Sequence, residues 1–96
     1  MYICLIKNKV SPDHITEYLE GAKAFAEDMK SVDGCVDAYI MQSDLDKDIV
    51  VNVEVWRSKE DKTNDDGSVF LKHKPNLRPY FLGNEFESYN TRGCNG

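Results

Sequence analysis

The feature that most constrains the fold of this chain is the run of residues 49–56, Ile-Val-Val-Asn-Val-Glu-Val-Trp. Successive side chains of a β-strand point to opposite faces of a sheet. One face of this strand would be entirely β-branched, and the other would carry an amide, a carboxylate and an indole. The first face is formed by Ile49, Val51, Val53 and Val55, and the second by Val50, Asn52, Glu54 and Trp56. Because both faces carry large apolar groups, we expect both to be covered.

The rest of the chain supplies further strand-like segments and two helical regions. The expected elements are, in order, a strand at 2–10, a helix at 12–30, strands at 35–43 and 49–56, a helical region at 58–84 that Gly67, Pro75 and Pro79 break into short pieces, and a strand at 85–92. This order, β-α-β-β-α-β, is that of a ferredoxin-like domain with an antiparallel sheet. The sequence therefore predicts one α+β domain over residues 1–92, followed by a flexible tail at 93–96.

Two helices in this connection order cover the same face of the sheet, so the other face has no cover from the same pair. Four β-branched residues, each worth ~1.5–3 kcal/mol when fully buried, are too many to leave in water. We expect the sheet faces of two identical chains to pack together as a homodimer. The alternative is a monomer in which residues 58–84 fold over the second face.

The net charge of −5 disfavours a nucleic-acid partner, because phosphate binding relies on clustered Lys and Arg. It also disfavours an anionic membrane surface, and no apolar run approaches the length that spans a bilayer. The N-terminus enters a strand pattern directly, which predicts a cytoplasmic protein. Because Cys4, Cys35 and Cys94 form no C-x-x-C pair, we expect reduced thiols, with Cys4 and Cys35 as small buried residues.

The mixed face of residues 49–56 is the first candidate site, since Asn52, Glu54 and Trp56 follow one another at two-residue spacing. An unpaired buried polar group costs ~1–3 kcal/mol, so we expect a pocket in which water or a ligand satisfies these groups. Alternatively, Glu54 pairs with a Lys or Arg near the sheet edge and Trp56 fills the core under a helix. Neither a metal cluster nor a phosphate-binding loop is visible, and we predict no metal and no cofactor.

Other side chains are candidates for the same pocket. His73 lies in the second helical region and is a candidate general base if it faces Trp56, although a lone helical His is more often solvated or capping. Phe70, Tyr39 and Tyr80 are candidate substrate contacts, and each tyrosine is equally suited to packing. In the strand at 35–43, alternation places Val36, Ala38 and Ile40 on one face and Cys35, Tyr39 and Met41 on the other.

Three short motifs resemble the antibiotic biosynthesis monooxygenase-like family of dimeric α+β barrels. They are Val10-Ser-Pro-Asp13 after the opening strand, Asp33-Gly-Cys35 after the first helix, and Asn52-Val-Glu-Val-Trp56 followed by Arg57-Ser-Lys-Glu60. The resemblance implies a homodimer whose sheets pack face to face, with a cavity in each subunit between sheet and helices. It also implies that Asn52 and Trp56 lie in that cavity.

The family includes enzymes that oxidise aromatic polyketides or quinols without metal or flavin. The substrate is deprotonated, and its electron-rich anion reacts directly with oxygen. By resemblance, Asn52 and Trp56 would hold substrate oxygens and stabilise the anion, and His73 is the candidate base. The chain departs from the family where many relatives have a His early in the second helix, since it has Asn64 or Asp65 there. It also has Ala38, with Tyr39 beside it, where many relatives have a Tyr.

Other functions of the same family outline stay open. A ligand-binding module would use the cavity without turnover, and a structural dimer would fill it with its own side chains. Sugar-phosphate isomerisation and haem degradation are less favoured. For haem degradation, the expected first-strand Asn falls at Ile6, with Asn8 offset by two, and the expected Trp of the second helix is missing. A small aromatic molecule is therefore the predicted ligand.

Overall fold

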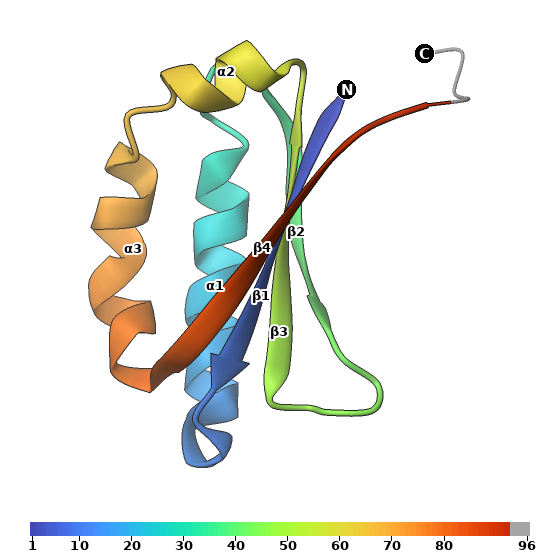
Figure 1. The fold of residues 1–96 in the computed structure, drawn as a ribbon. Coiled ribbons are helices and arrows are strands. Elements are labelled where there is room, and N and C mark those ends of the chain that lie inside the picture. The colour runs from blue at the N-terminus through green and yellow to red at the C-terminus, as the bar shows by residue number, and fades with distance from the viewer. Residues whose placement is uncertain (93–96) are drawn as a thin grey trace.

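The elements of the structure follow the predicted order (Figure 1). The computed structural model describes residues 1–92. Its elements are β1 (Tyr2–Val10), η1 (Pro12–His14), α1 (Ile15–Met29), β2 (Cys35–Gln42), β3 (Ile49–Trp56), α2 (Lys59–Asn64), α3 (Ser68–Leu77), η2 (Arg78–Tyr80) and β4 (Phe81–Asn90). The last strand thus begins earlier than predicted, directly after η2. The predicted tail at 93–96, with Cys94, lies outside the described residues. None of the helices within residues 1–92 has the length and apolar character needed to cross a membrane.

The strands form one antiparallel sheet in the order β2-β3-β1-β4. β3 and β1 lie in its centre, and their register places Tyr2 opposite Trp56. Both α1 and α3 lie on one side of the sheet, to the left in Figure 1, and no helix formed by residues 1–92 lies on the other side. The chain therefore has the α+β ferredoxin-like architecture that its element order predicts.

The core lies between α1 and the strands beneath it. Apolar residues of α1 recur at steps of three and four, so they form one buried stripe. This stripe consists of Tyr18, Ala22, Phe25, Ala26 and Met29. Below it, the side chains of Val50 and Trp56 have no exposed surface. Cys4 and Cys35 are buried free thiols, which confirms the burial predicted for both.

The side chains of β2 depart from simple alternation at the start of the strand. The register with β3 shifts between Cys35 and Asp37, so that Cys35 lies opposite Trp56 and Ala38 lies opposite Glu54. An extra residue in one strand turns the side chains before it to the other face. Cys35 and Ala38 are consequently both buried, whereas alternation alone predicts opposite faces for them.

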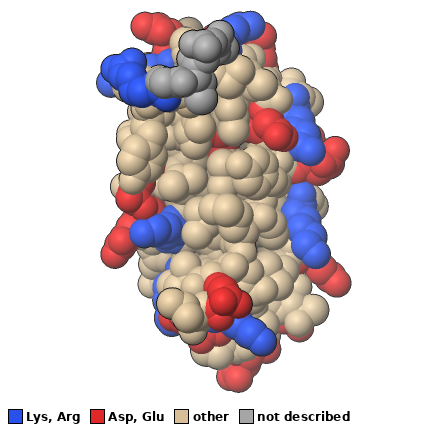
Figure 2. Space-filling view, turned by 90° about the vertical axis from the view of Figure 1, so that its right-hand side faces the viewer, with Lys and Arg blue, Asp and Glu red and all other residues tan. Residues whose placement is uncertain are grey.

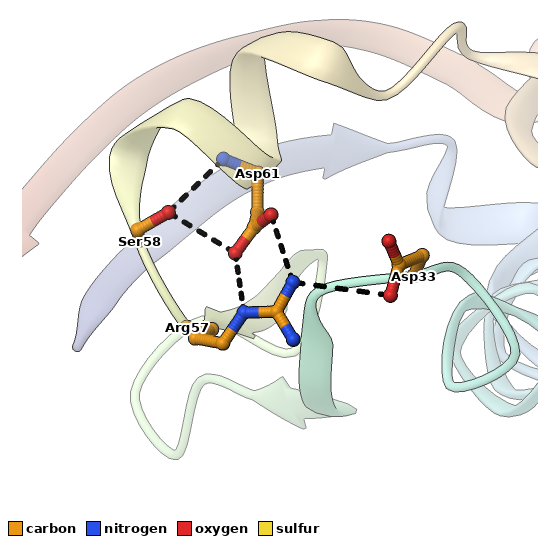
Figure 3. Close-up of polar contacts among 4 residues, drawn as sticks. All are labelled: Asp33, Arg57, Ser58 and Asp61. Atoms are coloured by element: carbon orange, nitrogen blue, oxygen red, sulfur yellow. Dashed lines mark hydrogen bonds and ion pairs between the residues drawn. The ribbon is translucent and has the colours of Figure 1, made fainter.

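A group of polar contacts joins the turn after α1 to the start of α2 (Figure 3). The hydroxyl of Ser58 accepts a hydrogen bond of 3.2 Å from the backbone N–H of Asp61, as their capping spacing predicts. The Asp61 carboxylate accepts two hydrogen bonds from Arg57, of 2.8 and 3.0 Å. Arg57 also lies 3.8 Å from Asp33, and its backbone N–H donates to the carbonyl of Gly34 at 2.9 Å. These contacts hold α2 at the end of β3.

The helix-free face of the sheet is apolar at its centre and charged at its borders. Figure 2 looks onto this side and shows mainly uncharged atoms in the middle, with Lys, Arg, Asp and Glu around them. Tyr39 and Met41 of β2 are 46% and 45% exposed there, and Lys7 pairs with Glu87 at 3.0 Å. The alternative in which residues 58–84 cover this face is wrong, because α3 packs beside α1 on the opposite face.

Candidate functional site

A cavity of about 620 Å³ lies between the sheet and the helix pair α1 and α3. β1, β3 and β4 contribute one wall, and α1, α3 and residues 62–67 contribute the other. The wall is mostly apolar and rich in aromatic rings, those of Tyr2, Tyr18, Phe25, Phe70, Phe81 and Phe86. A largely apolar cavity with few polar groups is typical of small-molecule sites. Within residues 1–92, no group of three or more His, Cys, Asp and Glu side chains is placed to hold a metal ion.

The cavity exists because only one of the two helices packs closely on the sheet. α1 packs on β2 and β3, whereas α3 packs mainly on α1. The space between α3 and the strands β1 and β4 is therefore not filled by helix side chains. On β4, Phe86 lies opposite Ile6 and remains 72% exposed. This leaves an aromatic ring at the edge of the cavity that a bound apolar molecule would cover.

Asn52 is the most distinctive polar residue of the cavity. Its position in β3 turns its side chain toward the helices, and the residue is 8% exposed. Among the described residues, its Oδ1 is the one buried side-chain nitrogen or oxygen without a hydrogen-bond partner. An unsatisfied buried acceptor costs ~1–3 kcal/mol. A hydrogen-bond donor on a ligand or a water molecule would satisfy it.

Glu54 and Trp56 form a hydrogen-bonded pair in the buried interior. The indole Nε1 of Trp56 donates to Oε1 of Glu54 at 3.1 Å. Glu54 lines the cavity, but Trp56 does not, because its ring has no exposed surface and packs in the core. Trp56 therefore fills the core, as the alternative interpretation expects, and it reaches the cavity through Glu54. The indole is thus not among the groups that line the cavity, and the predicted contact of Trp56 with a substrate stays a prediction.

The surroundings of Glu54 shift the pKa of its carboxyl group upward from the ordinary value. Burial raises the pKa of its carboxyl group, and the charge of Asp65 raises it further. The charge of Lys62 and the hydrogen bond from Trp56 lower the pKa, but Glu54 forms no ion pair with any described residue. On β1, Cys4 lies opposite Glu54, and burial raises the pKa of its thiol as well. Burial thus moves the carboxyl toward neutral pH and the thiol away from it.

His73 lies away from the cavity. Its Nε2 is 2.8 Å from Oδ2 of Asp28, and its ring centroid is 5.8 Å from that of Phe25. Lys72 donates a hydrogen bond of 3.1 Å to the same carboxylate oxygen. The carboxylate of Asp28 holds the imidazole between α3 and α1, so His73 does not meet the condition for a general base, which was a position facing Trp56.

The predicted substrate contacts are only partly brought together. Phe70 lines the cavity and packs edge to face on Phe25, with centroids 5.8 Å apart. Tyr80 instead stacks on His14, at 5.0 Å between centroids. Tyr39 lies on the helix-free face, because β2 and β3 pair in a register that turns its side chain away from the helices. Neither tyrosine is part of the cavity wall.

Several cavity residues escaped the sequence reasoning. Lys62, Lys74 and Arg78 lie along the cavity, and none of them forms an ion pair with a described residue. Lys74 and Arg78 are four positions apart, which places them on one face of a helix. This spacing could have predicted a pair of basic side chains on the same surface. Asn8 also lines the cavity, and its amide donates to the carbonyls of Ile6 and Val50, each at 3.1 Å. Its role required the register of β1 on β3.

Comparison with known proteins links the chain to one family. A family model described as antibiotic biosynthesis monooxygenase matches residues 1–64, a segment that includes Asn52, Glu54 and Trp56. No curated protein matches the sequence significantly.

Solved structures share the fold over nearly the whole chain. A candidate antibiotic biosynthesis monooxygenase from Nitrosomonas europaea aligns with a TM-score of 0.82 and 17% identity, over 95% of this chain and 98% of the other. One from Deinococcus radiodurans aligns with a TM-score of 0.81 and 13% identity, over 100% and 97%. A conserved protein from Methanosarcina mazei aligns with a TM-score of 0.78 and 22% identity, over 96% and 94%. At these identities the likeness shows the fold, and function must come from the site.

Proposed function

The chain belongs to the antibiotic biosynthesis monooxygenase family, and from this premise we propose that it oxidises a quinol or polycyclic aromatic phenol with O2, without a cofactor, in the cavity between sheet and helices. The observation that carries the proposal is the unpaired Oδ1 of Asn52 at an aromatic-lined cavity. A hydroxyl on an aromatic ring supplies the missing donor, while the ring covers Phe70 and Phe86. The volume of about 620 Å³ falls within the range of small-molecule pockets.

The chemistry requires no external reductant. Loss of the phenolic proton leaves an electron-rich anion, and its ring carbon reacts with O2. For a phenol whose keto form contains a methylene group, the overall reaction converts that methylene and O2 into a carbonyl group and water. The substrate supplies all four electrons, one oxygen atom enters the product and the other leaves as water. A quinol would instead give the quinone and hydrogen peroxide.

The side chain of Asn52 makes no hydrogen bond with the described residues, so its N–H groups are available to the developing oxyanion.

We further propose that the protein is a homodimer joined through the helix-free sheet face and acts in the cytoplasm. The support for the dimer is the apolar centre of that face, with Tyr39 and Met41 only half covered. The support for the compartment is the pair of free buried thiols, which a reducing environment preserves.

Oxygen uptake tests the proposed activity. The purified protein, with no added metal or flavin, is expected to accelerate oxygen consumption by 1,8-dihydroxyanthrone or a naphthoquinol. With labelled O2 and the anthrone, one labelled atom should appear in the product. Asn52→Leu removes the amide at similar volume and is expected to lower kcat about 100-fold, the usual effect of losing an oxyanion donor. Asn90→Leu, at an exposed position outside the cavity, is the matched control. The absence of any acceleration by the wild-type protein would contradict the proposal.

A further inference from the structure

The proposed oxidation needs a proton acceptor, and His73 lies outside the cavity that would hold the substrate. The acceptor must be a group that lines the cavity and exchanges its proton near neutral pH. The carboxyl groups on the cavity side of the sheet are those of Glu54 and Asp65. Glu87 also borders the cavity, but it lies opposite Leu5, so its carboxylate is on the helix-free face, where it binds Lys7 at 3.0 Å and the hydroxyl of Tyr89 at 2.6 Å. Glu54 is the one that is buried, at 7% exposure.

Glu54 is also the carboxylate nearest in the strand to Asn52. The two residues are separated by one position of β3, so their side chains emerge on the same face, about 6.5 Å apart along the strand. A single phenolic oxygen between them would lie within reach of an amide N–H on one side and a carboxylate oxygen on the other, while a second hydroxyl of the substrate or a water molecule donates to Oδ1 of Asn52. The oxidised ring would then extend toward Phe70 and Phe86.

The hydrogen bond from Trp56 gives the carboxylate a defined orientation. The indole N–H holds Oε1 at 3.1 Å, whereas Oε2 makes no hydrogen bond with any described residue. The core thus fixes Oε1 of Glu54, and Oε2 is available to contact a ligand. Because the indole is fully buried and packed, it acts through Glu54 and is a positioning residue.

We infer that Glu54 is the catalytic base of the cavity, oriented by Trp56, and that it accepts the proton of a phenolic hydroxyl whose oxygen lies between Glu54 and Asn52. This inference rests on the proposed function. In the step, the O–H bond of the substrate breaks, its electron pair stays on the substrate oxygen and the proton moves to Oε2. Asn52 donates a hydrogen bond to the resulting anion. After O2 adds to the ring carbon, the proton returns to the outer peroxide oxygen. The remaining hydrogen of that carbon then leaves as a proton, its electron pair forms the carbonyl bond, and the O–O bond breaks to release water.

The groups that face Glu54 are compatible with this role. Lys62 from α2 and Asp65 after it have opposite effects on the Glu54 carboxyl, and burial is the largest influence. From β1 and β2, Cys4 and Cys35 face it as neutral thiols, since burial raises the pKa of both, that of Cys35 to about 11. From α1, Tyr18 faces the cavity, and burial raises the pKa of its hydroxyl to about 12. Among Glu54, Cys4, Cys35 and Tyr18, Glu54 is therefore the group that can give up its proton below alkaline pH.

Proton-linked binding tests the inference without any turnover. The probe is 2,4-dinitrophenol, whose hydroxyl is ionised from mildly acidic to alkaline pH and which mimics the anion after proton transfer. The phenolate oxygen of the probe needs a hydrogen-bond donor, and Glu54 supplies one only when its carboxyl group is protonated. The affinity of the wild-type protein for the probe should therefore fall about tenfold per pH unit above the pKa of Glu54. Calorimetry in two buffers of different ionisation enthalpy should count one proton taken up per ligand bound above that pKa. Glu54→Gln should bind with an affinity independent of pH, and Glu20→Gln, exposed on α1, should behave as wild type.

The same binding measurement on Trp56→Phe is a second test, and it remains informative even if Glu54→Gln does not fold. The indole hydrogen bond lowers the pKa of Glu54, so its loss should move the break in the affinity profile to higher pH while the proton count stays at one. If the proposed oxidation is also correct, Glu54→Gln should lower kcat about 100-fold or more, and substrates already ionised at the assay pH should recover most of that loss. A flat pH profile in the wild-type protein, or no binding of the phenolate, overturns the inference. Failure of oxygen uptake with the proton linkage intact overturns the proposed function alone.

Discussion

Gly34 lies against the side chain of Asp61, so closely that a Cβ atom added to Gly34 would be 2.5 Å from the Cβ of Asp61. Gly34 also has φ +84°, which disfavours residues with a side chain. The Asp61 carboxylate is the acceptor for Arg57, and its backbone N–H is capped by Ser58 (Figure 3). The turn after α1 and the start of α2 therefore fit together only with glycine at this position.

Gly34→Ala is expected to destabilise the fold more than a left-handed backbone alone would. The left-handed conformation costs an alanine ~1–2 kcal/mol, and the contact with Asp61 adds to this. Gly67→Ala is the matched control, because Gly67 has φ +76° and no atom within 4 Å of the added Cβ. Urea unfolding of both variants measures the two free energies. Equal losses in the two variants would show that the approach to Asp61 contributes nothing.

The contact between α1 and α3 is expected to weaken in acid. Hydrogen bonds from His73 and Lys72 hold the pKa of Asp28 below its ordinary value. A carboxylate with a lowered pKa stabilises the folded state above its unfolded pKa, and this contribution is lost as pH falls through its folded pKa. Asp28→Asn should therefore lower the Tm at neutral pH, with a difference from wild type that shrinks below about pH 4. Asp44→Asn in the exposed β2–β3 loop is the control, and a difference that does not change with pH would contradict the assignment.

Most of the fold was accessible from the sequence, because its signals are local and repeated. The stripe of α1 and the alternation of β3 both extend over several turns or pairs, and Ser58 with Asp61 marks the start of α2. The bulge at Cys35 was not accessible, since a single extra residue changes no composition and its position depends on pairing with β3. The early start of β4 at Phe81 was missed because Pro79 precedes it and η2 leads directly into the strand.

For the candidate site, the direction of a side chain could be predicted on a strand, where side chains alternate between two faces. It could not be predicted on a helix, where the direction depends on how the helix is rotated about its axis. Parity alone places Asn52 and Glu54 toward the helices. The direction of His73 depends on how α3 rotates against α1, and the carboxylate of Asp28 that holds it is forty-five residues away in the chain. Burial of the Trp56 ring could not be predicted from residue spacing, because it depends on how the core cluster and Lys62 of α2 pack at that end of β3.

The buried thiols are expected to be unreactive while the protein is folded. Burial raises the pKa of Cys35 from 9.0 to about 11, so its thiolate fraction at slightly alkaline pH should be about 100-fold lower than that of an exposed cysteine. Burial raises the pKa of Cys4 in the same direction. In a Cys94→Ser background, iodoacetamide labelling followed by mass spectrometry should detect slow modification of both thiols in native buffer and fast modification in urea. Rapid labelling of either thiol in native buffer would show that this part of the core opens.

The proposed dimer predicts that one charge on the helix-free face, at Tyr39 of the edge strand β2, separates the subunits. Tyr39 is half exposed on that face in a single chain, so Tyr39→Glu should leave the fold of the subunit intact. Buried interface tyrosines commonly contribute about 2 kcal/mol or more, which corresponds to at least about thirtyfold weaker association, and an unpaired buried carboxylate weakens it further.

Analytical ultracentrifugation should show a dimer for the wild-type protein and a monomer for Tyr39→Glu at the same concentration, with unchanged circular dichroism. Leu45→Glu introduces the same charge at a residue that is 97% exposed in the β2–β3 loop, and it should remain dimeric. A monomeric wild-type protein would refute the dimer, and a dimeric Tyr39→Glu would place the interface on another surface.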